Sequence, residues 1–130
     1  LVLEPQNPSQ LNLQGRVKAK VMFEQIVKDY DSAMVNLGTV QWSDATERGK
    51  LTRAAVAALK AKALLYWASP QFNPTNDPKH PYDATRWQAA YKASEEAFNI
   101  ALEAGHNLMA DYSQIFQTEG PNNREAMIVR

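Results

Sequence analysis

Alanine is concentrated in the middle of this chain, and that concentration is the feature that most constrains its fold. The sequence holds 19 alanines, and 14 of them lie between Ala54 and Ala104. Alanine has the highest helix propensity of any residue, and its small side chain lets helices approach one another closely. The alanine-rich segments are therefore expected to be helices that pack on small faces.

Apolar residues at steps of three and four predict three main helices. The first is expected over about residues 16–37, with a stripe of Ala19, Met22, Phe23, Ile26, Val27, Tyr30, Ala33, Met34 and Leu37. The stripe of the third is Trp87, Ala90, Tyr91, Ser94, Ala97, Phe98, Ala101 and Leu102. Core packing is the favoured role for the helical aromatic residues, which are Phe23, Tyr66, Trp87, Tyr91 and Phe98.

Residues that start and stop helices fix the expected boundaries. Thr52 is placed to cap the second helix and Asp83 to cap the third. Pro70 ends the second helix, because the residue before a proline avoids the helical region. Gly38 and Gly105 can take the left-handed conformation that closes a helix. A short helix is expected over about residues 112–117.

Composition bounds the class of protein. A chain of 130 residues with 45% hydrophobic residues is long and apolar enough for one packed domain. The 14 basic and 14 acidic side chains balance, so no nucleic-acid-binding surface is expected. The absence of cysteine excludes disulfides, thiolate metal sites and cysteine nucleophiles from this chain. No apolar run is long enough to span a bilayer.

The helix centres are about 33–34 residues apart. The third helix alternates large and small residues, with Trp87, Ala90, Tyr91, Ala97 and Phe98, and this alternation is typical of tetratricopeptide-like helix pairs. The predicted fold class is therefore all-α, with tetratricopeptide-like helical repeats that are made irregular by long connections. Residues 1–15 are expected to be an irregular lead-in, residues 16–118 the helical region, and residues 119–130 a turn and a short strand. Because both ends look cut, the chain is expected to be a piece of a longer protein.

Catalysis is not expected from this inventory of residues. The chain has two histidines, His80 and His106, and no nucleophile motif or glycine-rich phosphate loop. Asp77, His80 and Asp83 recur every three residues in a loop, and such groups can bind metals. A polar surface loop in which Asp83 caps a helix is the favoured reading, so neither a metal nor a cofactor is predicted.

Binding residues are sought in the connections, where aromatic rings are not committed to a helix stripe. The segment 70–83 holds four prolines in fourteen residues, and loops of this length are often functional. Aromatic rings stack on the apolar faces of sugars, and amide side chains bond to the hydroxyls. The candidate ligand-binding residues are accordingly Trp42, Phe72, Asn73 and Tyr82.

Four ordered segments resemble the SusD/RagB family. The longest, GKLTRAAVAALKAKALLYWASPQFN at 49–73, is similar to the family's G-x-L-T…L-L-Y-x-A-S-P-x-F-N stretch. The others are IVKDYDSA at 26–33, WQAAYKASEEA at 87–97 followed by Gly105 and LMADYSQIF at 108–116, and NREAMI at 123–128. Trp67, Tyr30 and Met127 depart from the family's usual residues without changing the packing character of their positions.

The resemblance implies a surface-exposed lipoprotein of the outer membrane that binds glycans or other nutrients. Such proteins work with a SusC-like TonB-dependent transporter and are not enzymes. The implied partners are that transporter and an oligosaccharide or polysaccharide, and the implied membrane contact is an N-terminal lipid anchor outside this chain. The tetratricopeptide-like helices would serve as the scaffold that docks on the transporter.

Two other functions stay open at this point. One is a protein–protein interaction scaffold with no small-molecule ligand, and the other is binding of a non-glycan nutrient such as a peptide. A third, a hydrolase, is disfavoured by the residues present. An exposed aromatic platform beside amide side chains would favour nutrient binding. Helix faces left without a partner are expected to make the isolated chain associate.

Overall fold

Three long helices are the main elements of this computed structural model, which describes residues 1–7, 9, 15–39 and 50–128. They are α1 (Ala19–Leu37), α2 (Arg53–Ala68) and α3 (Thr85–Glu103). A single-turn helix, α4 (Gln114–Gln117), and a 3₁₀ turn, η3 (Gly120–Asn122), follow them. The expectation of a mostly helical, all-α chain is confirmed.

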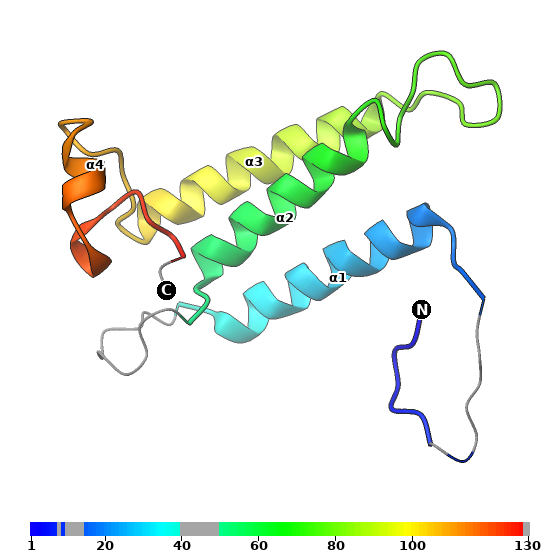
Figure 1. Ribbon diagram of the computed structural model, residues 1–130, viewed down its shortest axis with the longest axis horizontal. Coiled ribbons are helices and arrows are strands. Elements are labelled where there is room, and N and C mark those ends of the chain that lie inside the picture. Colours follow the sequence, from blue (N-terminus) through cyan, green and yellow to red (C-terminus); the bar gives the residue numbers. More distant parts are fainter. Residues whose placement is uncertain (8, 10–14, 40–49, 129–130) are drawn as a thin grey trace.

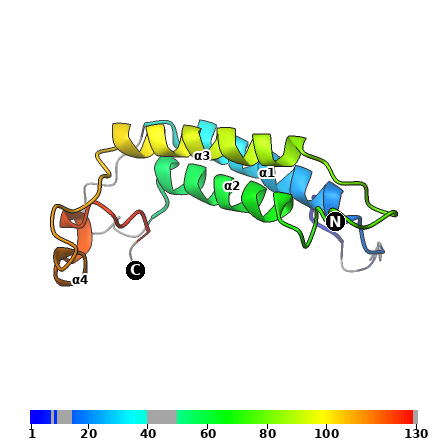
Figure 2. The same ribbon diagram turned by 90° about the horizontal axis from the view of Figure 1, so that it is seen from above.

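The three long helices run antiparallel to their neighbours, with α2 in the middle (Figure 1). Helix α2 packs against both α1 and α3. Seen from above, α2 is displaced to one side of the other two helices (Figure 2). The loop between α2 and α3 lies at one end of this arrangement, and α4 with the C-terminal segment lies at the other.

The helix ends follow the local chemistry. The Thr52 hydroxyl accepts a hydrogen bond from the Ala55 amide at 3.2 Å, which confirms the predicted cap. Gly38 has φ 52° and Gly105 has φ 86°, and each follows the end of a helix. The Gly105 amide donates to Leu102 and the His106 amide to Ala101, which is the Schellman pattern of a helix end.

Two boundaries differ from the prediction. Helix α1 begins at Ala19 instead of residue 16, because Lys18 is extended and offers no side-chain cap. The predicted C-terminal strand is wrong for the residues described up to 128, where the chain forms turns and bends. A strand needs a hydrogen-bonded neighbour. In the described part of the chain, the Arg124 carbonyl accepts a bond from the Asn107 amide, but Asn107 lies in the segment that follows α3 and not in a strand.

The core is a seam of alanines. Six of the nine residues in the main buried cluster are alanines, three from α2 and three from α3. The full cluster is Met34, Ala54, Val56, Ala57, Ala61, Ala93, Ala97, Ile100 and Ala101. The small side chains explain how α2 and α3 come close together, as the alanine content predicts.

The placement of four aromatic side chains in the core is wrong. Trp87, Tyr91 and Phe98 are exposed on α3, and Tyr66 is exposed on α2. The buried face of α3 is instead the row of Ala90, Ala93, Ala97, Ile100 and Ala101. Because four of these five residues are alanines and allow a close approach to α2, the bulky part of the predicted stripe is rotated away from the seam. Phe23 of α1, by contrast, is half-buried.

Lys60 links the three helices electrostatically. Its ammonium lies 2.7 Å from an Asp31 oxygen on α1 and 3.4 Å from a Glu96 oxygen on α3. The lysine side chain is 14% exposed, whereas its partners are about half exposed. Burial alone would lower the pKa of Lys60, but the two carboxylates outweigh it and the pKa is raised above the usual 10.5.

We expect Lys60→Met to cost about 1 kcal/mol of unfolding free energy at neutral pH, because two partly exposed ion pairs are lost. A raised pKa means that the contribution of Lys60 is complete below pH 10.5 and disappears as the pH rises through the higher folded-state value. The difference between the wild type and the variant in urea unfolding should therefore shrink above that pH. Lys62→Met, at an exposed position of the same helix, is the control. A difference that is unchanged at high pH would contradict this account.

Candidate functional site

The candidate site is the loop between α2 and α3 and the helix ends that hold it. Helix α2 stops where Ser69 becomes extended ahead of Pro70. The Ser69 hydroxyl donates to the Tyr66 carbonyl at 2.6 Å. The Ser69 carbonyl then accepts bonds from the Phe72 and Asn73 amides. This segment therefore makes a compact turn instead of a free connection.

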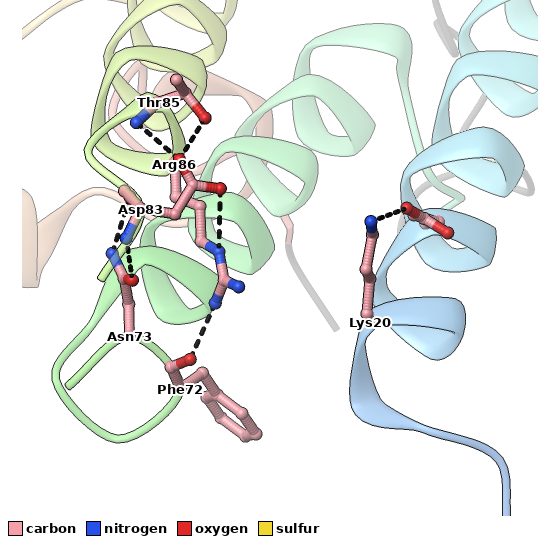
Figure 3. A network of polar contacts seen from close by, with 7 residues as sticks. Lys20, Phe72, Asn73, Asp83, Thr85 and Arg86 are labelled. Carbon is pink, nitrogen blue, oxygen red and sulfur yellow. Dashed lines mark hydrogen bonds and ion pairs between the residues drawn. The ribbon is translucent and has the colours of Figure 1, made fainter. Parts of the chain in front are cut away.

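Asn73 closes the loop by bonding to the backbone of Asp83. Its amide nitrogen donates to the Asp83 carbonyl at 2.9 Å, and its oxygen accepts from the Asp83 amide at 2.8 Å. Figure 3 shows the two bonds side by side. Asn73 is 2% exposed and is the buried polar residue of the described chain. We call this pair of bonds the Asn73 junction.

Asp83 also organises the start of α3. Its carboxylate accepts bonds from the amide and the hydroxyl of Thr85. The prediction that Asp83 is the cap of this helix is wrong by one position, because α3 begins at Thr85 and the cap residue is Ala84, which makes no side-chain cap bond. The bonds from Thr85, with the nearby Arg86 guanidinium, lower the pKa of Asp83 below 3.8. The Arg86 side chain contacts the Asp83 carboxylate at 3.6 Å. It also donates to the Phe72 carbonyl at 2.7 Å (Figure 3).

An aromatic cluster lies beside the Asn73 junction and joins all three long helices. The Trp67 ring stacks on Phe23 of α1 with 4.6 Å between centroids. Phe72 packs near Phe23, Tyr66 and Trp67 at 5.1–5.7 Å. The Arg86 guanidinium lies 3.9 Å from the centroid of the Trp67 ring, within the range of a cation–π contact. The base of the loop is thus a packed unit.

The four predicted ligand residues are placed in different surroundings. Phe72 is half-buried in the aromatic cluster, and Asn73 is buried with its amide bonded to the backbone. Tyr82, just before Asp83, is 46% exposed. Trp42 lies outside the described residues. The structure brings Phe72, Asn73 and the Tyr82–Asp83 step to one end of the bundle, where Phe72 and Asn73 hold the loop together.

Tyr66 is a surface group that the sequence pattern did not identify. It is 51% exposed, and its hydroxyl donates to the side-chain oxygen of exposed Gln71 at 3.0 Å. Its ring is supported from one side by the edge-on contact with Phe72. Its position in the last turn of α2 does not reveal this exposure, because Trp67 and Ala68 in the same turn are half-buried and fully buried.

The tip of the loop is an aspartate-centred turn. Asp77 accepts bonds from the Lys79 amide and from His80 Nδ1, both at 2.8 Å. The bond to His80 is the main reason that the pKa of Asp77 is lowered below 3.8. Asp83 is the third residue of the possible metal set, and its carboxylate is bonded to the Thr85 amide and paired with Arg86. Within the described residues, no group of three or more histidine, aspartate or glutamate side chains is arranged to hold a metal ion.

A second asparagine junction holds the C-terminal segment at the opposite end of α3. The Asn123 amide donates to the carbonyls of Ile115 and Thr118, at 3.1 and 3.3 Å. The Glu125 carboxylate accepts from the Met109 amide at 2.7 Å. Asn123 and Glu125 therefore fasten residues 123–125 to the turn that carries α4.

A small pocket lies at the end of the bundle away from the loop. It has a volume of about 120 Å³ and lies where α1 ends, α2 begins and α3 ends, and Gly38, Thr52 and Glu103 are among its lining residues. Small-molecule sites usually occupy about 300–1,000 Å³. In the part of the chain that the structure covers, no helix is long and apolar enough to cross a membrane.

Three comparisons with known proteins, against family models, curated proteins and solved structures, found no match for this chain. The fold and the site themselves define a small helical domain with a hydrogen-bonded surface loop at one end.

Proposed function

We propose that this chain is the helical portion of a SusD-like nutrient-binding protein, which captures a glycan at the cell surface and passes it to a SusC-like transporter of the outer membrane. The proposal begins from the resemblance of four segments to the SusD/RagB family. In this proposal the protein is a surface-exposed lipoprotein without catalytic activity. Its tetratricopeptide-like helices form the scaffold that meets the transporter.

The observation that supports nutrient binding best is the exposed aromatic surface beside the loop. Tyr66 and Tyr82 are about half exposed, and they flank the two ends of a loop that the Asn73 junction holds closed. The amide of Gln71 is bonded to the Tyr66 hydroxyl, so a ring and an amide are presented together. A sugar can stack on such a ring while the amide bonds to its hydroxyls.

The resembling segments also supply the groups that fasten the loops. Asn73 ends the longest resembling segment, and Asn123 and Glu125 belong to the last one. Each forms specific bonds to the backbone of a distant segment. This pattern agrees with a scaffold role for these three side chains. Ligand contact is left to exposed rings such as Tyr66, within the longest resembling segment, and Tyr82, outside it.

The test is a glycan array probed with the full-length protein that is expected to contain this chain. Tyr66→Ala and Tyr82→Ala should each weaken binding about fivefold to thirtyfold if their rings stack on the ligand. Tyr112→Ala is the matched control, because Tyr112 is an exposed tyrosine two residues before α4, which lies at the other end of the bundle. Tyr66→Phe separates loss of the hydroxyl bond to Gln71 from loss of the ring.

Binding to one polysaccharide class that these two variants reduce and the control does not would support the proposal. Binding that is insensitive to both tyrosines would support capture of a glycan elsewhere in the protein and would contradict this site. If the protein bound no glycan on the array, a non-glycan nutrient such as a peptide would be favoured.

A protein–protein interaction scaffold is the second candidate function, and one observation favours it. Helix α3 exposes Trp87, Tyr91, Phe98 and Leu102, and exposed apolar surfaces of this kind are typical of interaction sites. Under this function no oligosaccharide binds the full-length protein. Co-purification with a partner protein would support it only together with the absence of ligand binding, because docking on a transporter is expected under the first function as well.

A further inference from the structure

The start of α1 lies at the loop end of the bundle (Figure 1), and the two ends of this helix are held in different ways. Toward the C-terminal end, Met34 is buried in the core, and Asp31 makes an ion pair with α2 at 2.7 Å. Toward the N-terminal end, the Phe23 ring lies against Trp67 and Phe72, with centroids at 4.6 and 5.1 Å. We call these two ring contacts the Phe23 contact. Helix α1 therefore has two separate attachments.

The first two turns of α1, residues 19–26, have little stability of their own. Lys18, which precedes the helix, makes no side-chain cap bond, and the first turn contains no acidic residue. Lys18 and Lys20 instead place positive charge near the positive end of the helix dipole, which is unfavourable. Lys20 pairs with Glu24 at 3.7 Å, but the two side chains are 71% and 62% exposed, and such pairs contribute little.

Burial adds little support to the same two turns. Residues 19–22 and Glu24 are exposed, whereas Phe23, Gln25 and Ile26 are half-buried. Phe23 has the largest of these half-buried side chains. The order of residues 19–26 therefore depends strongly on the Phe23 contact.

The Phe23 contact is built from groups of the loop base. Phe72 lies in the loop itself, and the Arg86 guanidinium of α3 donates to its carbonyl at 2.7 Å. The same guanidinium lies 3.9 Å from the centroid of the Trp67 ring. The Asn73 junction, next to Phe72 in the chain, closes the loop. The position of the rings that receive Phe23 is therefore set by the closed loop.

We propose that residues 19–26 form a strap that is ordered by the Phe23 contact and is released when the loop base opens. Proteins open locally in cooperative units, whose opening free energies range from near zero up to the global value. Release of the strap uncovers the faces of Trp67 and Phe72 that Phe23 covers. Because linked equilibria act reciprocally, a ligand that fixes the closed loop would also order the strap. The strap does not depend on nutrient binding, since it rests on contacts within the chain.

Hydrogen exchange of the whole chain, followed by NMR spectroscopy, tests whether the strap opens separately. After correction for intrinsic rates, the amides of residues 23–26 should exchange at least tenfold faster than those of residues 31–37. Phe23→Ala should speed the exchange of the strap about tenfold, whereas Phe23→Tyr, which keeps the ring, should leave it unchanged. Lys18→Asp supplies the missing cap and should slow it about fivefold. Equal wild-type rates at the two ends of α1 would overturn the proposal.

Two asparagine substitutions test the coupling between the strap and the loop. Asn73→Ala breaks the Asn73 junction and should speed the exchange of residues 23–26 about fivefold to tenfold. Asn123→Ala is the matched control, because it breaks the asparagine junction at the other end of α3, and it should change these rates less than about twofold. Arg86→Met removes the bond to the Phe72 carbonyl and is the second variant should Asn73→Ala fail to fold.

Faster exchange of the strap in Asn73→Ala or Arg86→Met, with the control unchanged, would support the proposal. Equal acceleration by Asn73→Ala and Asn123→Ala would show a general loss of stability and would overturn it. Strap exchange that neither loop-base variant changes would also overturn it, because the strap would then be independent of the loop.

Discussion

Asn73→Ala is expected to lower the unfolding free energy by about 2–3 kcal/mol, which corresponds to a drop of roughly 10 °C in melting temperature. The variant loses both bonds of the Asn73 junction and leaves the amide and the carbonyl of Asp83 without their partner. These groups are only partly buried, so water replaces some of the loss. Urea unfolding monitored by circular dichroism measures the change.

Asn76→Ala is the matched control for this variant. Asn76 lies in the same loop and is exposed, so its removal should change stability by no more than about 0.5 kcal/mol. Asn73→Asp keeps the acceptor but turns an oxygen toward the Asp83 carbonyl, and it should be at least as damaging as alanine at neutral pH. Equal stability of Asn73→Ala and Asn76→Ala would show that the junction does not hold the loop.

Trp67→Ala is expected to lower the unfolding free energy by about 2–4 kcal/mol, because the substitution removes a large half-buried ring from the centre of a packed cluster. The variant loses the stacking contact with Phe23, the contact with Phe72 and the cation–π contact with Arg86. Since Phe23 lies on α1 and Arg86 on α3, the loss loosens all three long helices at this end. Thermal unfolding of the purified chain measures it.

Trp87→Ala provides the comparison for a tryptophan outside the cluster. Trp87 is exposed on α3, so Trp87→Ala should change the unfolding free energy by about 0.5 kcal/mol or less. Trp67→Phe should fall between the wild type and Trp67→Ala, because a smaller ring keeps part of the stacking. If Trp67→Ala and Trp87→Ala proved equally mild, the cluster would not be a stabilising unit.

The sequence predicted the helices well because their signals are local. The caps and closing glycines at Thr52, Gly38 and Gly105 act within a few residues of the helix end, so spacing alone locates them. The face that each helix buries depends on its neighbours instead. Periodicity placed Tyr91 and Phe98 in the core, but the close approach of α2 admits only the alanine row.

The candidate site could be located from the sequence but not described. Four prolines marked the loop, and Phe72, Asn73 and Tyr82 do lie at its base. The roles of these residues depend on contacts across ten or more positions, such as the bonds between Asn73 and Asp83 and between Arg86 and Phe72. No local pattern reveals such contacts. The exposure of Tyr66 was missed for the same reason, since its stripe position looked apolar.

The alanine seam also has a mechanical consequence. A methyl side chain has no rotamers to exchange, so the six alanines of the contact between α2 and α3 lose no side-chain entropy on folding. We therefore expect the pair of helices α2 and α3 to be stiff. Its length, about 28 Å for the 19 residues of α3, sets the distance between the loop at one end and the fastened C-terminal segment at the other. A displacement of the loop end would therefore move the C-terminal end with it, because the helix pair between them deforms little.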